Sequence, residues 1–234
     1  MIRKLLPKSL KIKWQLYKRA QRDRRSGFSK LLAQKKSFTN GFTHSITITQ
    51  PIKNNTGAVN KVHNIKLAFQ HIERLIIAPG ETFSYWNSIP APIAKNGFKK
   101  GRNLLAGKLQ EDYGGGLCQL SGMLYIALLR AGVEIVERHH HSIDIYTDLN
   151  RYTPLGSDAT VVYGYKDLRF RNNLNQQIAF QMYFKENELD LHLISDKPIK
   201  EKEISWHLTS TNTYKTVETR NSKGTVIAVS RYQV

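Results

Sequence analysis

Apolar residues recur at helical spacing in a segment near the middle of the chain, and this pattern gives the clearest prediction of local structure. The segment follows the glycine run Gly114-Gly-Gly116, which frees the backbone from its usual steric limits. Its apolar positions lie three or four residues apart: Leu117, Leu120, Leu124, Ala127, Leu128 and Ala131. This spacing predicts a buried helix, and Gly132 is a typical residue for its C-terminal end.

A second helix is predicted from an N-cap at Asn64 to a stop before Pro79, because apolar residues again recur at helical spacing. The stretch 81–107 contains several prolines and glycines and is expected to be rich in loops. Residues 167–173 and 178–184 are expected to form one strand pair. Alternating or β-branched patterns predict strands over 42–50, 82–86, 133–136, 142–146, 156–163 after an opening turn, 167–173, 178–184, 188–194, 203–208, 213–220 and 225–232.

Together these elements predict an α+β fold, in which two core helices pack on a mostly antiparallel β-sheet and a basic helical arm precedes them. We expect residues 1–36 to form the arm and residues 37–195 to form the main domain. Residues 196–234 are expected to be a β-hairpin extension packed on that domain. A chain of 234 residues is long enough to bury a sizeable core.

Positive charge is concentrated at the N-terminus. The net charge is +18, of which +12 lies in residues 1–36, +5 in residues 37–184 and +1 in residues 185–234. The arm also has a rough apolar stripe: Leu5, Leu6, Leu10, Trp14, Leu16 and Tyr17. Such a helix can lie on an anionic membrane surface, neutralise nucleic-acid phosphates, or pack on its own domain or a partner. Nucleic acid is the least favoured, because no nucleic-acid-binding module accompanies the arm.

The sequence has no run of uncharged apolar residues long enough to span a bilayer. Its N-terminus lacks the apolar block and the cleavage site of a secretory signal. The single cysteine, Cys118, excludes an internal disulfide and fits a reducing compartment. We therefore expect a cytoplasmic protein that is either free or peripheral to the inner membrane.

Cys118 is a candidate nucleophile because it falls in the first turn of the predicted central helix. Unpaired N–H groups and the positive end of the helix dipole favour a thiolate at such a position. Three histidines follow at 139–141, and a histidine can accept the thiol proton. A lone cysteine is also commonly a small buried apolar residue, and the sequence leaves that alternative open.

An enzyme of acyl transfer or amide hydrolysis would give these residues separate roles. Cys118 would attack a carbonyl, with His141 or His139 as the base, because both lie on one side of an extended chain. Asp158 is the expected carboxylate that orients the imidazole. The residues expected to bind the oxyanion and the substrate are Gly115, Gly116, Gln119 and Ser121. We expect neither a cofactor nor a metal ion in this scheme.

Two other interpretations use the same part of the chain. Cys118, His139 and His141 would supply three ligands to a zinc ion, although the chain lacks the paired spacing of a structural zinc site. Alternatively, the glycine-rich helix N-terminus would bind a carboxylate, such as a peptide terminus, without covalent chemistry.

Five short motifs occur along the chain in a characteristic order. They are Pro79-Gly-Glu-Thr-Phe-Ser84, Gly114-Gly-Gly-Leu-Cys-Gln119, Glu137-Arg-His-x-His-Ser142, Gly156-x-Asp-Ala-Thr-Val161 and Asp167-Leu-Arg-Phe-Arg-Asn-Asn173. Together they resemble the VanW family over roughly residues 42–195. The resemblance implies a role in the bacterial cell envelope, with peptidoglycan stem peptides as substrate or ligand. Some proteins with VanW domains are associated with L,D-transpeptidation through a cysteine, which corresponds to Cys118 here.

Overall fold

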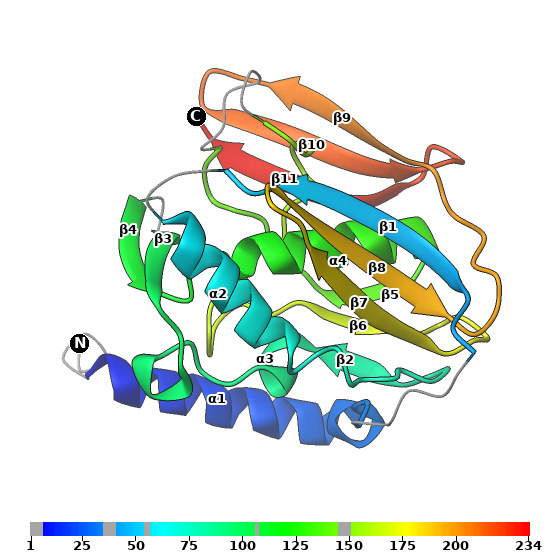
Figure 1. The fold of residues 1–234 in the computed structure, drawn as a ribbon. Helices are drawn as coiled ribbons and strands as arrows, with labels where there is room; N and C mark the ends of the chain where they lie inside the picture. The colour runs from blue at the N-terminus through cyan, green and yellow to red at the C-terminus, as the bar shows by residue number, and fades with distance from the viewer. Residues whose placement is uncertain (1–6, 35–40, 54–56, 106–107, 145–150) are drawn as a thin grey trace.

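A computed structural model describes residues 7–34, 41–53, 57–105, 108–144 and 151–234. The chain has the predicted α+β class, with helices packed against antiparallel sheets (Figure 1). Throughout these described ranges, each helix is either too short or too polar to cross a bilayer.

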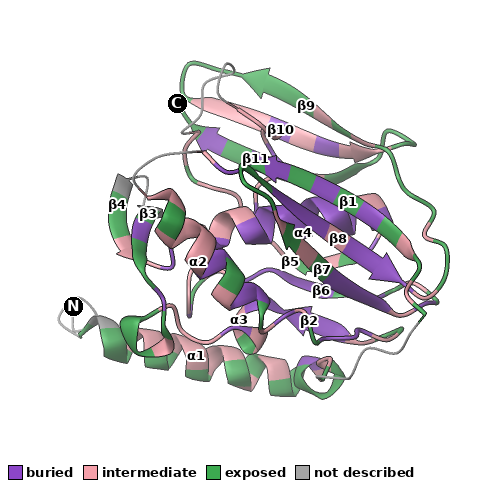
Figure 2. Cartoon of the chain, viewed as in Figure 1, coloured by how far each residue is buried: buried purple, intermediate pink, exposed green. Residues whose placement is uncertain are grey.

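The central layer is an antiparallel sheet with the strand order β1–β8–β7. Its strands are β1 (His44–Pro51), β7 (Ile178–Phe184) and β8 (Glu188–Ser195). Along β1, buried and exposed residues alternate, so that Ile46 and Ile48 enter the core while their neighbours face solvent. The middle strand, β8, is buried along most of its length (Figure 2).

Helices α2 (Ala58–Phe69) and α4 (Leu117–Ala131) pack on each other, and α4 also packs on β1 and β8. Helix α4 is enclosed by the rest of the fold, because nearly all of its side chains are buried (Figure 2). Left-handed glycines flank it: Gly116 with φ 101° before its first residue and Gly132 with φ 72° after its last. The helix predicted from the apolar spacing is therefore confirmed.

A second antiparallel sheet has the order β2–β6–β5 and carries the segment that leads into the histidines. Its strands are β2 (Thr82–Ser84), β5 (Glu134–Glu137) and β6 (Arg169–Arg171). Between β2 and α4 the chain forms a short helix, a 3-10 turn and a hairpin: α3 (Tyr85–Ser88), η3 (Ala94–Asn96), β3 (Lys100–Leu105) and β4 (Lys108–Tyr113).

The two ends of the chain pack on opposite sides of this core (Figure 1). At the N-terminal end are α1 (Lys8–Arg25) and η2 (Phe28–Leu31). The C-terminal end forms an antiparallel sheet of β9 (Ile204–Ser210), β10 (Tyr214–Asn221) and β11 (Val226–Gln233). The Gln233 N–H donates to the carbonyl of Ser142 at 2.9 Å, which joins β11 to the segment after the histidines.

Several predictions of local structure were wrong in position or pairing. Helix α2 begins at Ala58, so Asn64 is a buried mid-helix residue rather than an N-cap. The region 81–107 contains β3, and no regular strand occupies 156–163. Strand β6 pairs with β2 and β5, not with 178–184. The predicted strand 142–146 lies partly outside the described residues, whereas the strands from β7 to β11 are confirmed with small shifts of their ends.

Candidate functional site

Cys118 lies in the first turn of α4, where the sequence places it, and its side chain is partly exposed. The Cys118 thiol donates to the carbonyl oxygen of Val161 at 3.9 Å. The segment that contains Val161 also carries Asp158, so this irregular stretch runs beside the start of the helix. A sulfur at this position is enclosed by the fold but still reachable from solvent.

His141 connects Cys118 to Asp158. Its Nδ1 lies 2.6 Å from Oδ2 of Asp158, and its backbone N–H donates to the same carboxylate oxygen at 2.6 Å. Burial alone would lower the pKa of His141, but side-chain hydrogen bonds with Asp158 and Cys118 raise it to about 9. Since Asp158 occupies Nδ1, Nε2 is the ring nitrogen left for proton exchange with the thiol. The result is a Cys–His–Asp arrangement with a protonated imidazole at neutral pH.

Asp158 is held by several donors besides His141. Burial would raise the pKa of its carboxyl, but the hydrogen bond with His141, the nearby charges and the Tyr232 hydroxyl together keep that pKa well below its ordinary value. The Arg138 guanidinium donates to Oδ1 of Asp158 at 3.1 Å, and the Tyr232 hydroxyl donates to the same oxygen. Arg138 also donates to the carbonyl of Gly156 at 2.8 Å and to the Ser230 hydroxyl at 2.5 Å. These contacts fix the carboxylate as an anion that faces the imidazole.

The glycine run shapes the turn before Cys118. A Cβ at Gly115 would lie 2.7 Å from the Cα of Gly101, so only glycine allows α4 to begin this close to β3. The N–H groups of Gln119 and Leu120 both donate to the carbonyl of Gly116. Cys118 is the second residue of α4, so its N–H lies in the first turn, where N–H groups lack acceptors within the helix. An N–H at such a position can bind a developing oxyanion.

The three histidines have different partners. Nε2 of His139 lies 2.9 Å from Oε1 of Glu137, and the backbone of His139 accepts from Thr160. Nδ1 of His140 donates to the carbonyl oxygen of His141 at 2.7 Å, and the His140 ring packs against the ring of Tyr232. After the end of β5 at Glu137, His139 and His141 therefore contact two different carboxylates, those of Glu137 and Asp158.

The zinc interpretation needs Cys118, His139 and His141 to converge. Since His139 is paired with Glu137, these side chains do not meet at one point. In the part of the chain that the structure describes, no group of three or more His, Cys, Asp or Glu side chains is arranged to hold a metal ion. His141, which contacts Asp158, is the histidine whose raised pKa reflects an interaction with Cys118.

Comparison with protein families places these residues in a known context. The family model described as VanW like protein matches residues 60–194. The chain belongs to the VanW family. The match contains Cys118, His141 and Asp158, so the whole Cys–His–Asp arrangement lies in the VanW region.

Two relatives of the VanW region extend this comparison. The uncharacterized protein YoaR of Bacillus subtilis is 37% identical over 127 residues, which are 54% of this chain and 40% of YoaR. The vancomycin B-type resistance protein VanW of Enterococcus faecalis is 37% identical over 114 residues, which are 49% of this chain and 42% of that protein. The chain thus spans less than half the length of either relative. No solved structure matches.

Two of the residues that we expect to bind substrate, Ser121 and Gln119, make hydrogen bonds within the chain. Ser121 is fully buried, and its hydroxyl donates to the carbonyl of Ala159 at 2.5 Å. Gln119 donates from Nε2 to the carbonyl of Pro51 at 3.1 Å, which directs its amide toward β1. Both contacts position α4 against its neighbours.

Sequence reasoning missed two groups that support the site. Asn64, inside α2, donates to the carbonyls of Gly115 and Lys99 and accepts from the Lys99 N–H, which holds the glycine turn in place. Tyr232 and Ser230 come from β11, outside the VanW match. The alternation of β11 could have indicated that Tyr232 points inward, but no local pattern specifies Asp158 as its partner.

Proposed function

We propose that this protein is a cysteine acyl transferase or amidase that acts on peptidoglycan stem peptides, in the manner of an L,D-transpeptidase. The observation that carries the proposal is the hydrogen bond of His141 with Asp158, in a fold where the Cys118 thiol contacts the carbonyl of Val161 in the same segment as Asp158. The family supports the choice of substrate, since VanW membership implies the cell envelope and one relative is named for vancomycin resistance.

The proposed chemistry uses Cys118 as the nucleophile and His141 as the group that carries the proton. The Cys118 thiolate attacks the carbonyl carbon of the peptide, and the carbonyl oxygen becomes an oxyanion bound by the Cys118 N–H. As the C–N bond breaks, the protonated His141 donates its proton to the leaving amine, and a thioester remains on Cys118. An incoming amine or water then attacks the thioester and gives a proton to the neutral His141. Release of the acyl product restores the thiolate and the imidazolium.

Asp158 contributes without exchanging a proton itself. Its hydrogen bond holds the imidazole of His141 in one orientation, and its negative charge stabilises the imidazolium between the two half-reactions. Arg138 and Tyr232 keep the carboxylate ionised while it does so. This division of roles is common to unrelated enzymes with a nucleophile, a base and an orienting carboxylate.

The test is to incubate the protein with purified muropeptides and follow the products by mass spectrometry. The proposal predicts an acyl-enzyme adduct on Cys118 and a released amine, both absent in Cys118→Ala. Cys118→Ala should still bind the peptide, because it removes the nucleophile and leaves the backbone intact. Peptide binding by the wild type without any turnover or adduct would contradict the proposal and favour the carboxylate-binding module instead.

A further inference from the structure

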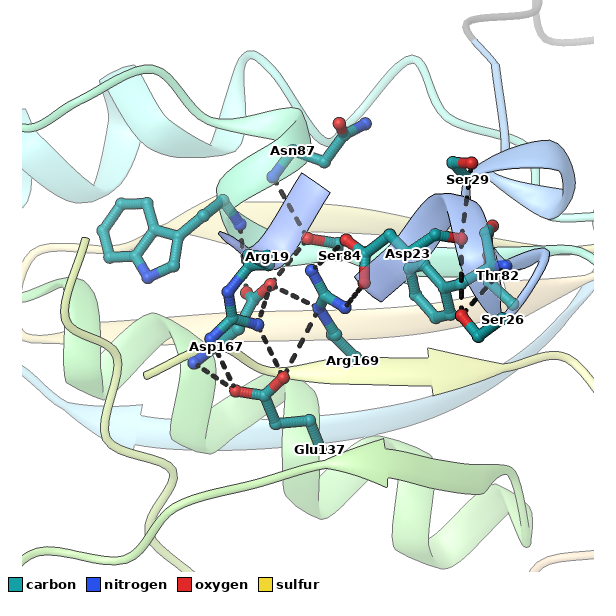
Figure 3. Close-up of polar contacts among 12 residues, drawn as sticks. Arg19, Asp23, Ser26, Ser29, Thr82, Ser84, Asn87, Glu137, Asp167 and Arg169 are labelled. Carbon is teal, nitrogen blue, oxygen red and sulfur yellow. Dashed lines mark hydrogen bonds and ion pairs between the residues drawn. The ribbon is translucent and has the colours of Figure 1, made fainter. Parts of the chain in front are cut away.

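Helix α1 is fastened to the domain by ion pairs along one of its faces, shown in Figure 3. Arg19 donates to both oxygens of Glu137, at 2.6 and 3.0 Å. Asp23 accepts from two nitrogens of Arg169, at 2.7 and 2.8 Å. Bidentate pairs of this kind fix both position and orientation. The arm is therefore docked on the domain in a defined rotation about its axis.

The docked face is also shielded from solvent. The side chains of Arg19 and Arg169 are 12% and 9% exposed, and Asp167 beside them is fully buried. The Arg169 guanidinium lies 4.6 Å from the ring centre of Phe28, the buried residue that follows α1. Replacing one partner of these pairs would leave the other charge unpaired in a partly buried place, so the pairs specify how α1 sits on the domain.

The opposite face of α1 carries large apolar side chains that the domain does not cover. Leu10 is 48% exposed, and Trp14 and Tyr17 are each 53% exposed. They are spaced by four and three residues and so lie on one side of the helix, about half a turn away from Arg19 and Asp23. The rings of Trp14 and Tyr17 stack with their centres 5.8 Å apart. This gives one continuous apolar patch along the outer side of the helix.

Basic residues border this patch on both sides. By helical position, Lys13 and Arg24 flank one edge, while Lys18 and Arg25 flank the other. The Lys18 ammonium lies 5.6 Å from the centre of the Trp14 ring. The only acidic residue of α1, Asp23, is turned inward to Arg169. The outer side of α1 is therefore apolar along its middle and purely positive along its edges.

We propose that this outer face of α1 binds the surface of an anionic lipid bilayer. A tryptophan and a tyrosine beside a leucine suit the boundary between headgroups and acyl chains, and the flanking cations complement the phosphate charges. Nucleic acid would need the cations but not the exposed apolar patch between them. Because the inner face is docked, binding would hold the whole domain, with Cys118, in a fixed orientation to the membrane.

The test is co-sedimentation of the full chain with vesicles of phosphatidylcholine that contain phosphatidylglycerol, compared with phosphatidylcholine alone. Wild type should bind the anionic vesicles and lose binding at high salt. The triple variant Leu10→Ser, Trp14→Ser, Tyr17→Ser should lose at least about tenfold in affinity for the anionic vesicles. Tyr183→Ser is the control for the single substitution Tyr17→Ser, because Tyr183 is exposed to the same degree, 52%, and belongs to β7 rather than to α1.

Fluorescence and DNA binding further test whether the partner of the outer face of α1 is a lipid bilayer or nucleic acid. The fluorescence of wild type should shift to the blue with anionic vesicles, and Trp14→Phe should lose most of that shift. Equal binding of the triple variant and wild type would overturn the proposal. So would tighter binding to a DNA duplex than to anionic vesicles with no effect of the apolar substitutions, which would assign the face to nucleic acid.

Discussion

His139 and His141 lie two residues apart and each contacts a carboxylate, yet they belong to clusters with different chemistry. His139 meets Glu137, whose carboxylate also receives two hydrogen bonds from Arg19. His141 meets Asp158 and, on its other side, the thiol of Cys118. Under the proposed function, the nearby thiol is what distinguishes the His141–Asp158 pair from the His139–Glu137 pair.

The carboxylates of Glu137 and Asp158 also differ in the groups that surround them. Burial would raise the pKa of Glu137, but its hydrogen bonds with His139 and Arg19 and the charges of Arg19 and Arg169 lower it to about 2. This carboxylate therefore remains an anion that fastens α1 to the domain. Around Asp158 the same physics stabilises an imidazolium beside a thiol. The Glu137 cluster joins α1 to the domain, and the Asp158 cluster is the one to which we assign proton transfer in the proposed function.

The largest expected effect separates the two histidines directly. His141→Asn should lower peptide turnover by about a thousandfold or more, because the proton donor to the leaving amine is lost. His139→Asn should change turnover by less than about threefold, because His139 does not face Cys118. Mass-spectrometric product yields measure both. Comparable losses in the two variants would remove the distinction on which the assignment of His141 rests.

The pH dependence of stability gives the next largest effect. The pKa of His141 is raised from 6.5 to about 9, so its protonation stabilises the folded state. This contribution is complete below about pH 6.5 and is lost as the pH rises through about 9, with an upper limit of about 3 kcal/mol. The urea midpoint of wild type should fall over this range, and that of His141→Asn should stay nearly constant.

The contribution of the Glu137 cluster to the stability of the folded protein should be lost at acid pH. Its lowered pKa means that the contribution of Glu137 is complete above about pH 4.5 and is lost as the pH falls toward 2. In a plot of the urea midpoint against pH, Glu137→Gln should therefore reduce the fall at acid pH and leave the fall at alkaline pH unchanged. If Glu137→Gln also abolished the fall of the urea midpoint at alkaline pH, the Glu137 and Asp158 clusters would be energetically coupled.

A smaller effect tests the contribution of the C-terminal sheet. Tyr232→Phe removes one donor to Asp158 while keeping the buried ring. We expect turnover to fall several-fold, with the alkaline limb of its pH profile displaced upward, because the carboxylate becomes a stronger partner for His141. A merely structural role would lower stability without moving the profile. An unchanged profile would show that Tyr232 does not position Asp158.

The sequence predicts the parts of the site that depend on local patterns. Helix α4 and the place of Cys118 follow from apolar spacing and from the glycines that bound the helix. The choice between His139 and His141 could not be made in this way, because both follow β5 in an irregular segment whose course is set by tertiary contacts. The sequence predicts Asn64 as an N-cap because asparagine often forms hydrogen bonds with the backbone of its own helix end. In the structure its side chain forms them with the backbone of Lys99 and Gly115, and no local pattern distinguishes the two cases.

Long-range contacts explain most of the remaining differences. The bond from Tyr232 to Asp158 spans 74 residues, and the pair of Arg19 with Glu137 spans 118. Such partners follow from the packing of whole elements, so no local window of sequence contains them. The same holds for Ser121, which we expect to bind substrate and whose buried hydroxyl donates to the carbonyl of Ala159, 38 residues further along the chain.

The reactivity of Cys118 toward iodoacetamide, measured as a function of pH, tests the central claim most directly. If His141 holds a proton beside the thiolate, wild type should be alkylated rapidly at pH 6, with little further increase up to pH 8. His141→Asn should react at least about tenfold more slowly at pH 6, and its rate should rise with pH as for an ordinary thiol. A wild-type rate that already behaves as an ordinary thiol, unchanged in His141→Asn, would contradict the account.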